Sequence, residues 1–472
     1  MATSPHRIVY LDNLRNVLVY NVVVLHVVQM FGYPLLFWWA VTDKEGSSRF
    51  YETGLIGMDM YLMPCLLFIA ALFILPSLNK RTPLEYIKKR FFRLCVPAVV
   101  FLFCAGDIYF QLLLTRLNRV APSYLETFLN FWRFYFNMPG ISVSGSEKTL
   151  NAVTFNLQHV WFLTLLFFIT LFVVLWRLLF NKNSGEPEKV DSRNKVISKT
   201  IIFAAALGLA YAAVHIYYVG HQINFSAWLL VGKVIQFQLN KIWVLLPLFL
   251  FGLYVYKKNW LTRSDIGSWK MWGGAAFLLL AIYLLIYHFG ILPALEEIFK
   301  AVDYNMQSDD KMEMPVVAAS IRRASLLSWI LLPPVCVFLL MFFLSFAKRF
   351  FNQPNAATTF CSKHSINVYV LHYAPVLILQ YTFLNVAVPS MVKIVLMAII
   401  IIPACLWLSH RLVYPYPKAA IAFFVALKLM ALAAGFTFYY FAFLALIFIS
   451  FAGAVYESVK YLNARTTGLK SA

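Results

Sequence analysis

The chain is built from long apolar runs of about 20 residues each, the length that an α-helix needs to cross a lipid bilayer. Apolar and polar residues do not alternate within these runs, as the strands of a membrane β-barrel would require. The runs therefore predict membrane-spanning helices. They begin near Val17, Thr53, Leu94, Trp161, Thr200, Ile242, Met271, Leu326, Ile366 and Lys393.

A further apolar stretch, residues 418–456, is interrupted at Gly435 and predicts two more helices. Lys428 falls in the middle of the first of them, where an ammonium group needs a partner or a route to the membrane surface. We expect an all-α polytopic membrane protein with about ten core transmembrane helices plus a C-terminal helical pair. The predicted division is a transmembrane core over residues 1–411, and a C-terminal membrane hairpin with a cytoplasmic tail over residues 412–472.

The composition agrees with a membrane protein and excludes other classes. Only 13% of the residues are charged and 61% are hydrophobic, whereas a soluble domain is about 25% charged. This excludes a soluble globular enzyme, a disordered protein and a disulfide-rich secreted module. No basic soluble domain is long enough to bind nucleic acid, so the net charge of +20 is assigned to cytoplasmic loops. The six cysteines show no CxxC spacing, and we expect neither disulfides nor a metal site.

Basic residues concentrate in the even-numbered loops between the predicted helices, and the seventh loop is acidic. The positive-inside rule then places both termini in the cytoplasm, with Lys460 and Arg465 marking the C-terminal side. Asp12 and Arg15 stand directly before the first run, and no cleavage site follows it. We therefore expect this run to remain as a membrane helix rather than to be removed as a signal peptide.

The first candidate site is in this first helix. His26 follows Arg15 by eleven residues, which is about 16 Å along a helix and nearly the same face. Asp12 lies one turn before Arg15. Ionisable groups at this depth usually face a cavity. The alternative is a histidine that only packs between helices and bonds to a neighbour.

A second candidate is the basic sequence that opens the third helix. Arg90 and Arg93 are three residues apart on one helical face, and Lys89 stands beside them. Guanidinium groups suit phosphates, and a cytosolic nucleotide would arrive at this end of the helix. The alternative, which charge alone favours, is a topology determinant that contacts anionic lipid headgroups.

Two more segments carry polar groups in apolar surroundings. Ser365, Tyr369 and His372 line one face near the start of the ninth helix, either as polar contacts between helices or as groups that orient a substrate. His159 and Trp161 open the fourth helix on the outer side, where an aromatic belt is the simpler interpretation. Asp59 and Asp107 are intramembrane acids in the second and third helices, and the sequence shows no partner for Asp107.

Taken in order, these segments resemble the membrane acyltransferases of the acyltransferase type-three family, which modify O-antigens, glucans and other surface glycans. The similarity covers residues 10 to about 411, on the helices where the family carries its motifs. The matching segments are Tyr10–Arg15 followed by His26 (a basic residue, ten residues, a histidine), Lys89–Pro97 (an arginine-rich helix entry), His159–Leu163 (a tryptophan–phenylalanine–leucine segment) and Ser365–His372 (a late histidine helix).

The resemblance implies acyl transfer from cytoplasmic acyl-CoA, by default acetyl-CoA, to a hydroxyl of a carbohydrate or other surface-destined acceptor. It implies a bacterial inner-membrane protein whose partners are acyl-CoA, the acceptor and membrane lipids. It makes His26 the general base, with Asp12 or Arg15 setting its environment or contacting the donor. The donor-binding residues would be Lys89, Arg90, Arg93, Tyr369 and His372. The acceptor-binding residues would be Asp59, His159, Trp161 and Ser365.

Other interpretations stay open. Within the same class, a covalent acyl-histidine could carry the acyl group across the membrane. A transporter or flippase of a polar metabolite or lipid-linked sugar would also place His, Asp and Arg in a membrane cavity. Against it, the sequence shows no internal repeat and no paired interrupted helices. A structural scaffold would explain the hydrophobicity but not the histidines. No Walker A, GxGxxG, HExxH or GxSxG motif is present, which argues against an ATP-driven pump.

Overall fold

The computed structural model describes residues 8–119, 123–137, 141–143, 157–180, 190–223, 228–308, 312 and 319–466. Within these residues, 11 helices are long and apolar enough to cross a membrane, so the predicted all-α polytopic fold is confirmed. The chain divides into two compact units. Unit 1 comprises Met1–Leu18, Glu52–Ala98 and Tyr135–Asn355, and unit 2 comprises Val19–Tyr51, Val99–Phe134 and Ala356–Ala472.

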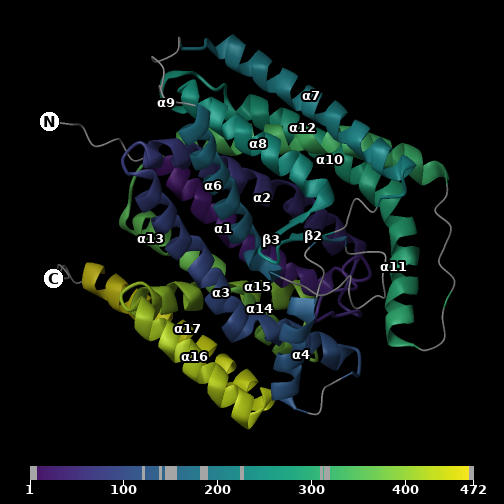
Figure 1. Ribbon diagram of the computed structural model, residues 1–472, viewed down its shortest axis with the longest axis vertical. Coiled ribbons are helices and arrows are strands. Elements are labelled where there is room, and N and C mark those ends of the chain that lie inside the picture. The colour runs from purple at the N-terminus through teal and green to yellow at the C-terminus, as the bar shows by residue number, and fades with distance from the viewer. Residues whose placement is uncertain are drawn as a thin grey trace. The chain divides into compact units, whose positions relative to one another are not determined.

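Helices account for most of the described chain (Figure 1). In the first half they are α1 Val9–Val28, η1 Gln29–Phe31, α2 Arg49–Leu78, α3 Pro83–Arg116, α4 Tyr124–Asn137, η2 Gln158–Val160, α6 Trp161–Phe180 and α7 Arg193–Gly220. In the second half they are α8 Leu239–Lys257, α9 Trp260–Arg263, α10 Trp269–Ile286, η3 Tyr287–Ile291, α11 Leu292–Gln307, α12 Ala319–Phe350, α13 Ala356–Leu371, α14 Tyr373–Phe383, α15 Ser390–Leu408, η4 Ser409–Val413, α16 Pro417–Ala434 and α17 Phe436–Thr466.

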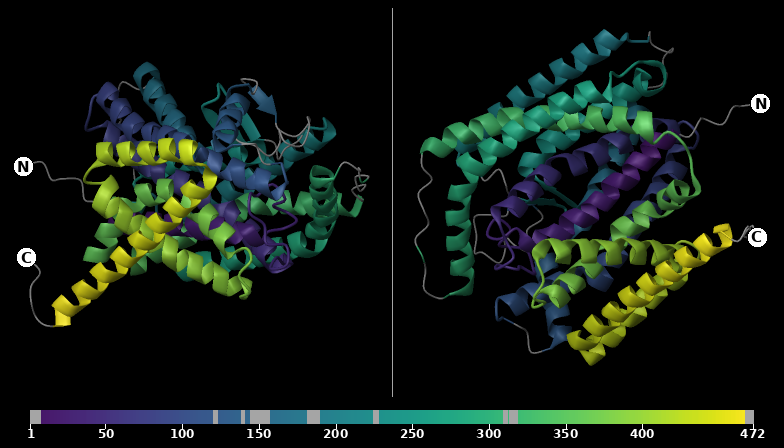
Figure 2. Two further views of the ribbon diagram at one scale, coloured as in Figure 1. Left: turned by 90° about the horizontal axis from the view of Figure 1, so that it is seen from below. Right: turned by 180° about the vertical axis from the view of Figure 1, so that it is seen from behind.

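In unit 1, α12 packs against α7 and α10, and these three helices lie side by side in Figures 1 and 2. The contact of α7 with α12 depends on Gly208. A Cβ atom at this position would lie 2.5 Å from the backbone oxygen of Ile330. Small residues allow this close backbone approach, which stabilises helix pairs that cannot rely on the hydrophobic effect within lipid.

Unit 1 also contains a small antiparallel sheet that the sequence analysis did not predict. Its order is β1 (Ile141–Val143), β2 (Trp228–Val231), β3 (Ile235–Gln238). In the β2–β3 hairpin Val231 pairs with Ile235, and the turn between them includes Gly232 and Lys233 with φ of 56° and 62°. Positive φ at successive turn residues matches the twist of a tight hairpin. The strands lie in connections between the spanning helices, so the apolar runs carried no signal for them.

In unit 2 the C-terminal hairpin packs onto the preceding helices. α17 contacts α14, α15 and α16, and the α16–α17 pair stands out in yellow in Figures 1 and 2. The two helices divide at Gly435, which has φ of 96°, as the sequence predicted.

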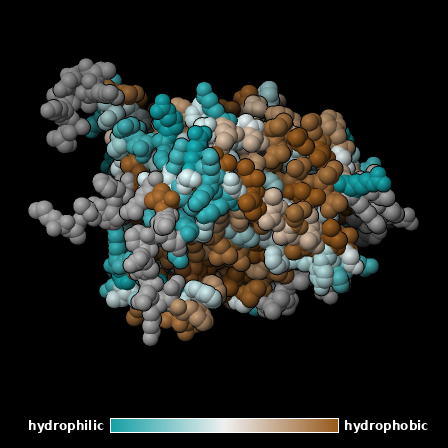
Figure 3. Space-filling view, turned by 90° about the horizontal axis from the view of Figure 1, so that it is seen from above, coloured by the Kyte–Doolittle hydropathy of each residue, from teal (hydrophilic) through white to brown (hydrophobic). Residues whose placement is uncertain are grey.

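Figure 3 shows broad apolar surface on the face in view, with hydrophilic side chains gathered mainly to one side. Such apolar surface is what helices in contact with lipid present.

Lys428 of α16 finds its partner inside unit 2. Its Nζ donates to both carboxylate oxygens of Asp107 in α3, and to the hydroxyl of Tyr124 in α4 at 2.8 Å. Both charged side chains have no exposed surface. The rings of Tyr124, Phe128 and Tyr439 surround the ammonium group, with centroids 4.6 to 4.9 Å away. The prediction that Lys428 needs a partner is confirmed, and that partner is the acid for which the sequence showed none.

The ninth predicted helix differs from the expectation because it is interrupted at His372. It begins at Ala356 rather than near Ile366, ends as α13 at Leu371, and resumes as α14 at Tyr373. Pro375 has no N–H to donate to the carbonyl of Leu371, and in a regular helix its ring would clash with that carbonyl. Ser365, Tyr369 and His372 therefore lie towards the end of α13 and at the break, not near the start of a continuous helix as predicted.

Candidate functional site

His26 lies in the last turn of α1, half-buried in unit 2. Directly after α1 the chain tightens into the 3₁₀ turn η1, whose first residue is Gln29. A residue three positions further on lies beside His26 on the helix surface. The Gln29 Oε1 atom is 2.6 Å from His26 Nδ1, so this ring nitrogen is engaged by a hydrogen bond.

His372, at the break between α13 and α14, stacks on His26. The two ring centroids are 5.3 Å apart with an interplanar angle of 27°. The His372 side chain is fully buried, and its Nδ1 donates to the backbone oxygen of Val368 at 3.1 Å. The ring of Tyr369 lies 5.9 Å from that of His372. The structure thus brings together three residues that the sequence placed in two distant motifs.

Trp39 and Tyr373 complete an aromatic enclosure that the sequence analysis missed. The buried Trp39 ring stacks on His26 with centroids 5.8 Å apart and planes 10° apart. Tyr373 meets His26 and Trp39 edge-on, at 5.4 and 5.7 Å. Trp39 ends the first apolar run, where a tryptophan is usually assigned to the membrane interface. Tyr373 directly follows His372, and the sequence carried no separate signal that would single it out.

Gln380 of α14 ties this enclosure to the end of α1. Its Oε1 accepts a hydrogen bond from Trp39 Nε1 at 2.9 Å. Its Nε2 donates to the backbone oxygens of His26 and Val27, at 2.8 and 3.1 Å. The last carbonyls of a helix lack partners within it, and this buried amide provides one. One side chain therefore holds both the helix end that carries His26 and the ring stacked on it.

A second cluster of predicted residues lies in unit 1, at the start of α1 and α3. Arg15 forms an ion pair with Asp12 at 3.3 Å. Arg93 interacts electrostatically with Arg15, Arg90 and Asp12. Arg90 donates to the hydroxyl of Tyr86 at 3.0 Å, which orients its guanidinium group. Three guanidinium groups with one carboxylate leave an excess of positive charge, and this favours an anion.

Lys89 is exposed on α3, next to this basic cluster. Asp59 of α2 pairs with Lys241 of α8, 2.6 Å from its Nζ. Ser365 is buried and donates to the backbone oxygen of Ser362 at 3.3 Å.

The predicted outer residues His159 and Trp161 lie where η2 meets α6 in unit 1. His159 is buried, and Trp161 meets Trp228 of β2 edge-on at 5.5 Å. Their assignment to the acceptor stays a prediction.

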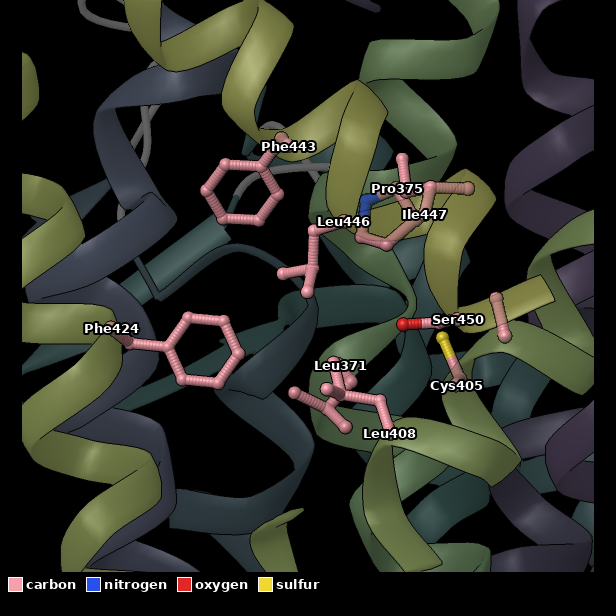
Figure 4. A pocket seen from close by; sticks show the side chains of 10 residues that line it. Leu371, Pro375, Cys405, Leu408, Phe424, Phe443, Leu446, Ile447 and Ser450 are labelled. Carbon is pink, nitrogen blue, oxygen red and sulfur yellow. The ribbon is translucent and has the colours of Figure 1, made fainter. Parts of the chain in front are cut away.

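A small apolar cavity lies behind the helix break in unit 2, with a volume of about 30 Å³. Figure 4 shows Leu371 and Pro375 on one side and Phe424 and Phe443 of the C-terminal hairpin on another. Its polar lining is limited to Cys405 and Ser450. The cavity therefore lacks the acid–base groups that proton transfer requires. Such groups gather around His26 instead. In the described part of the chain, no three His, Cys, Asp or Glu side chains form a group that could hold a metal ion.

The arrangement suits proton transfer in apolar surroundings. Two imidazoles face each other, each with its Nδ1 bonded to an oxygen, and aromatic rings limit access of water. Neutral imidazole is the side chain best suited to take up a proton near neutral pH. The basic cluster in unit 1 adds a site for anions on the same helix, α1.

Comparison with models of protein families matches residues 8–410 to an acyltransferase domain, the one that defines the type-three family. No curated protein and no solved structure matches the chain. The matched region includes both histidines and the basic cluster, and it ends before the C-terminal hairpin. The chain therefore belongs to the acyltransferase type-three family of membrane acyltransferases.

Proposed function

We propose that the protein transfers an acyl group, acetyl by default, from cytoplasmic acyl-CoA to a hydroxyl of a carbohydrate or other surface-destined acceptor. The observation that carries this proposal is the stacking of His26 on His372 inside an aromatic enclosure, in a chain of this family. Other acyl donors would use the same chemistry at the same residues.

In the proposed reaction, the Nε2 atom of His26 takes the proton of the acceptor hydroxyl as the hydroxyl oxygen attacks the thioester carbon. The new C–O bond forms and the C–S bond breaks. The departing CoA thiolate then takes the proton back from the imidazolium. General-base assistance of this kind contributes about 10²–10⁴-fold to the rate. His372, stacked on His26, would position the acyl group.

The basic cluster would hold the phosphates of the donor. Arg15, Arg90 and Arg93 bring guanidinium groups to the ends of α1 and α3 that the positive-inside rule assigns to the cytoplasm. Guanidinium forks bind phosphate oxygens with two hydrogen bonds at once. The same rule supports the proposal that both termini lie in the cytoplasm. The bacterial inner-membrane location is proposed from the family and this topology.

The function is tested with membrane vesicles that contain the protein and acetyl-CoA labelled in its acetyl group. We expect the label to leave CoA and to appear in the glycan or lipid fraction as a base-labile ester, with one CoA released per ester formed. Dissipation of a solute gradient without covalent change would instead support a transporter. A base-stable label would exclude ester formation.

Replacing Arg93 by alanine should weaken the use of acyl-CoA. One charge-assisted hydrogen bond contributes about 1.5–3 kcal/mol, so the KM for acetyl-CoA should rise about 10- to 100-fold, with a smaller change in kcat. The measurement is CoA release in the same membrane vesicles, which supply the acceptor, at a series of donor concentrations. Lys80→Ala, which removes an exposed charge between α2 and α3, is the control. An unchanged KM in Arg93→Ala would refute the phosphate role.

A further inference from the structure

The hydrogen bond between Gln29 and His26 determines which ring nitrogen carries the proton. The amide oxygen Oε1 can only accept, and it lies 2.6 Å from Nδ1. Nδ1 must therefore donate. A neutral imidazole has one N–H, so its lone pair is then on Nε2. Nε2 is the atom that the proposed reaction uses as the base.

Gln29 is held in the orientation that this role needs. It opens the 3₁₀ turn after α1, and its backbone oxygen accepts from the N–H of Gly32 at 3.2 Å. Only 9% of its surface is exposed. Gln380 binds the backbone oxygen of His26, and Trp39 covers one face of the ring. The imidazole is thus fixed at its backbone, at one face and at Nδ1.

The partner at Nδ1 is a neutral amide, and this matters for the protonation of the base. Among the described residues, the rings of His372, at the α13–α14 junction, and of Tyr373 of α14 contact the His26 ring. A carboxylate in the place of Gln29 would favour the charged imidazolium through its opposite charge. An amide sets the same tautomer without that stabilisation. The neutral ring, which is the form that accepts a proton, is therefore not disfavoured by a charged partner at Nδ1.

We infer that Gln29 is a positioning residue for His26, holding Nδ1 protonated so that Nε2 takes the proton of the acceptor hydroxyl. This inference rests on the proposed function of His26 as the general base. It names a residue outside the sequence motifs, and it assigns to an amide the orienting role that a carboxylate has in many histidine-based sites.

Two variants of the full-length protein separate this role from a purely structural one. Gln29→Met keeps the length and burial of the side chain but removes the acceptor. Gln29→Glu keeps the acceptor and adds a charge. The measurements are kcat, the KM for acetyl-CoA and the pH dependence of kcat/KM, from CoA release in membrane vesicles that supply the acceptor, with thermal stability recorded for each variant.

We expect Gln29→Met to lose kcat by at least about 10-fold, up to the ~10²–10⁴-fold that general-base assistance contributes, with little change in KM. Gln29→Glu should keep more activity than Gln29→Met. The acidic limb of its pH profile should move about 1 pH unit or more upward, because the added carboxylate favours the imidazolium over the neutral base. A purely structural role gives the opposite order, since an apolar side chain is tolerated better than a buried charge.

A Gln29→Met variant with wild-type kcat, or a Gln29→Glu variant that is less active than Gln29→Met, would overturn the inference. Failure of the proposed function is distinguishable, because the wild type would then release no CoA from any acyl donor. Histidine ¹⁵N NMR tests the tautomer without activity. His26 is identified among the 9 histidines by its missing signal in His26→Ala. We expect an Nδ1-protonated ring in the wild type and a mixture in Gln29→Met, and a wild-type ring protonated at Nε2 would refute the inference.

Discussion

Replacing His26 by alanine is expected to reduce acyl transfer by about 10²–10⁴-fold, the contribution of a general base. The ring is at the centre of the contacts that define the site, with His372, Trp39 and Tyr373 against it and Gln29 at its Nδ1. Alanine removes the proton acceptor but leaves the backbone of α1 bound to Gln380. The measurement is incorporation of a labelled acetyl group into the acceptor in isolated membranes.

The matched control is His221→Ala, which removes an exposed imidazole just after α7 in unit 1. It should leave the transfer rate unchanged. Equal amounts of each variant in the membrane and a monodisperse profile in detergent establish that the loss is chemical. Transfer by His26→Ala at more than about a tenth of the wild-type rate would exclude this residue as the general base.

Replacing Lys428 by methionine is expected to destabilise unit 2 by about 3–5 kcal/mol, the cost of removing one partner from a buried ion pair. Asp107 would be left as a carboxylate without its ammonium partner, at a position with no exposed surface. The Tyr124 hydroxyl would lose the hydrogen bond that it accepts from Lys428. The measurement is thermal or denaturant unfolding of the purified protein in detergent. The amount of each variant in the membrane fraction of cells is recorded as well.

The matched variant is the double replacement Lys428→Met with Asp107→Leu. Replacing both members of a buried pair by apolar side chains is often neutral, so the double variant should recover most of the stability. Non-additivity between the two substitutions should be about 0.5–3 kcal/mol, as for residues in contact. Wild-type stability of Lys428→Met, or a double variant as unstable as the single one, would show that the pair does not anchor the hairpin.

Most of the fold could be predicted because bilayer thickness imposes a length on each apolar run, and that length is a local property of the sequence. The helix division at Gly435 and the need for a partner at Lys428 were readable in the same way. The partner itself was not, since Asp107 lies in a helix far away in the chain. Pro375 did carry a local signal for the break at His372, but a proline within an apolar run does not always interrupt a helix.

The candidate site was predicted in part, for a related reason. His26 and His372 stand out because imidazoles are rare in apolar runs, yet their stacking depends on tertiary packing. Trp39 and Gln380 have no periodicity that distinguishes them from interfacial or packing residues. Gln29 is different, since its spacing of three residues from His26 is visible in the sequence. Its role becomes visible only in the structure, where the 3₁₀ turn after α1 begins at Gln29 and the Gln29 side chain bonds to His26 Nδ1.

The most direct test of the central claim uses the purified protein in nanodiscs with acetyl-CoA and the glycan or lipid fraction that supplies the acceptor hydroxyl, comparing the wild type with His26→Ala. Thermal stabilisation reports donor binding, and release of free CoA reports chemistry. We predict stabilisation of both proteins, because the basic residues of unit 1 are intact in each, and CoA release by the wild type alone. No stabilisation and no CoA release with acetyl, succinyl or longer acyl donors would contradict an acyl-CoA-dependent enzyme and favour a transporter.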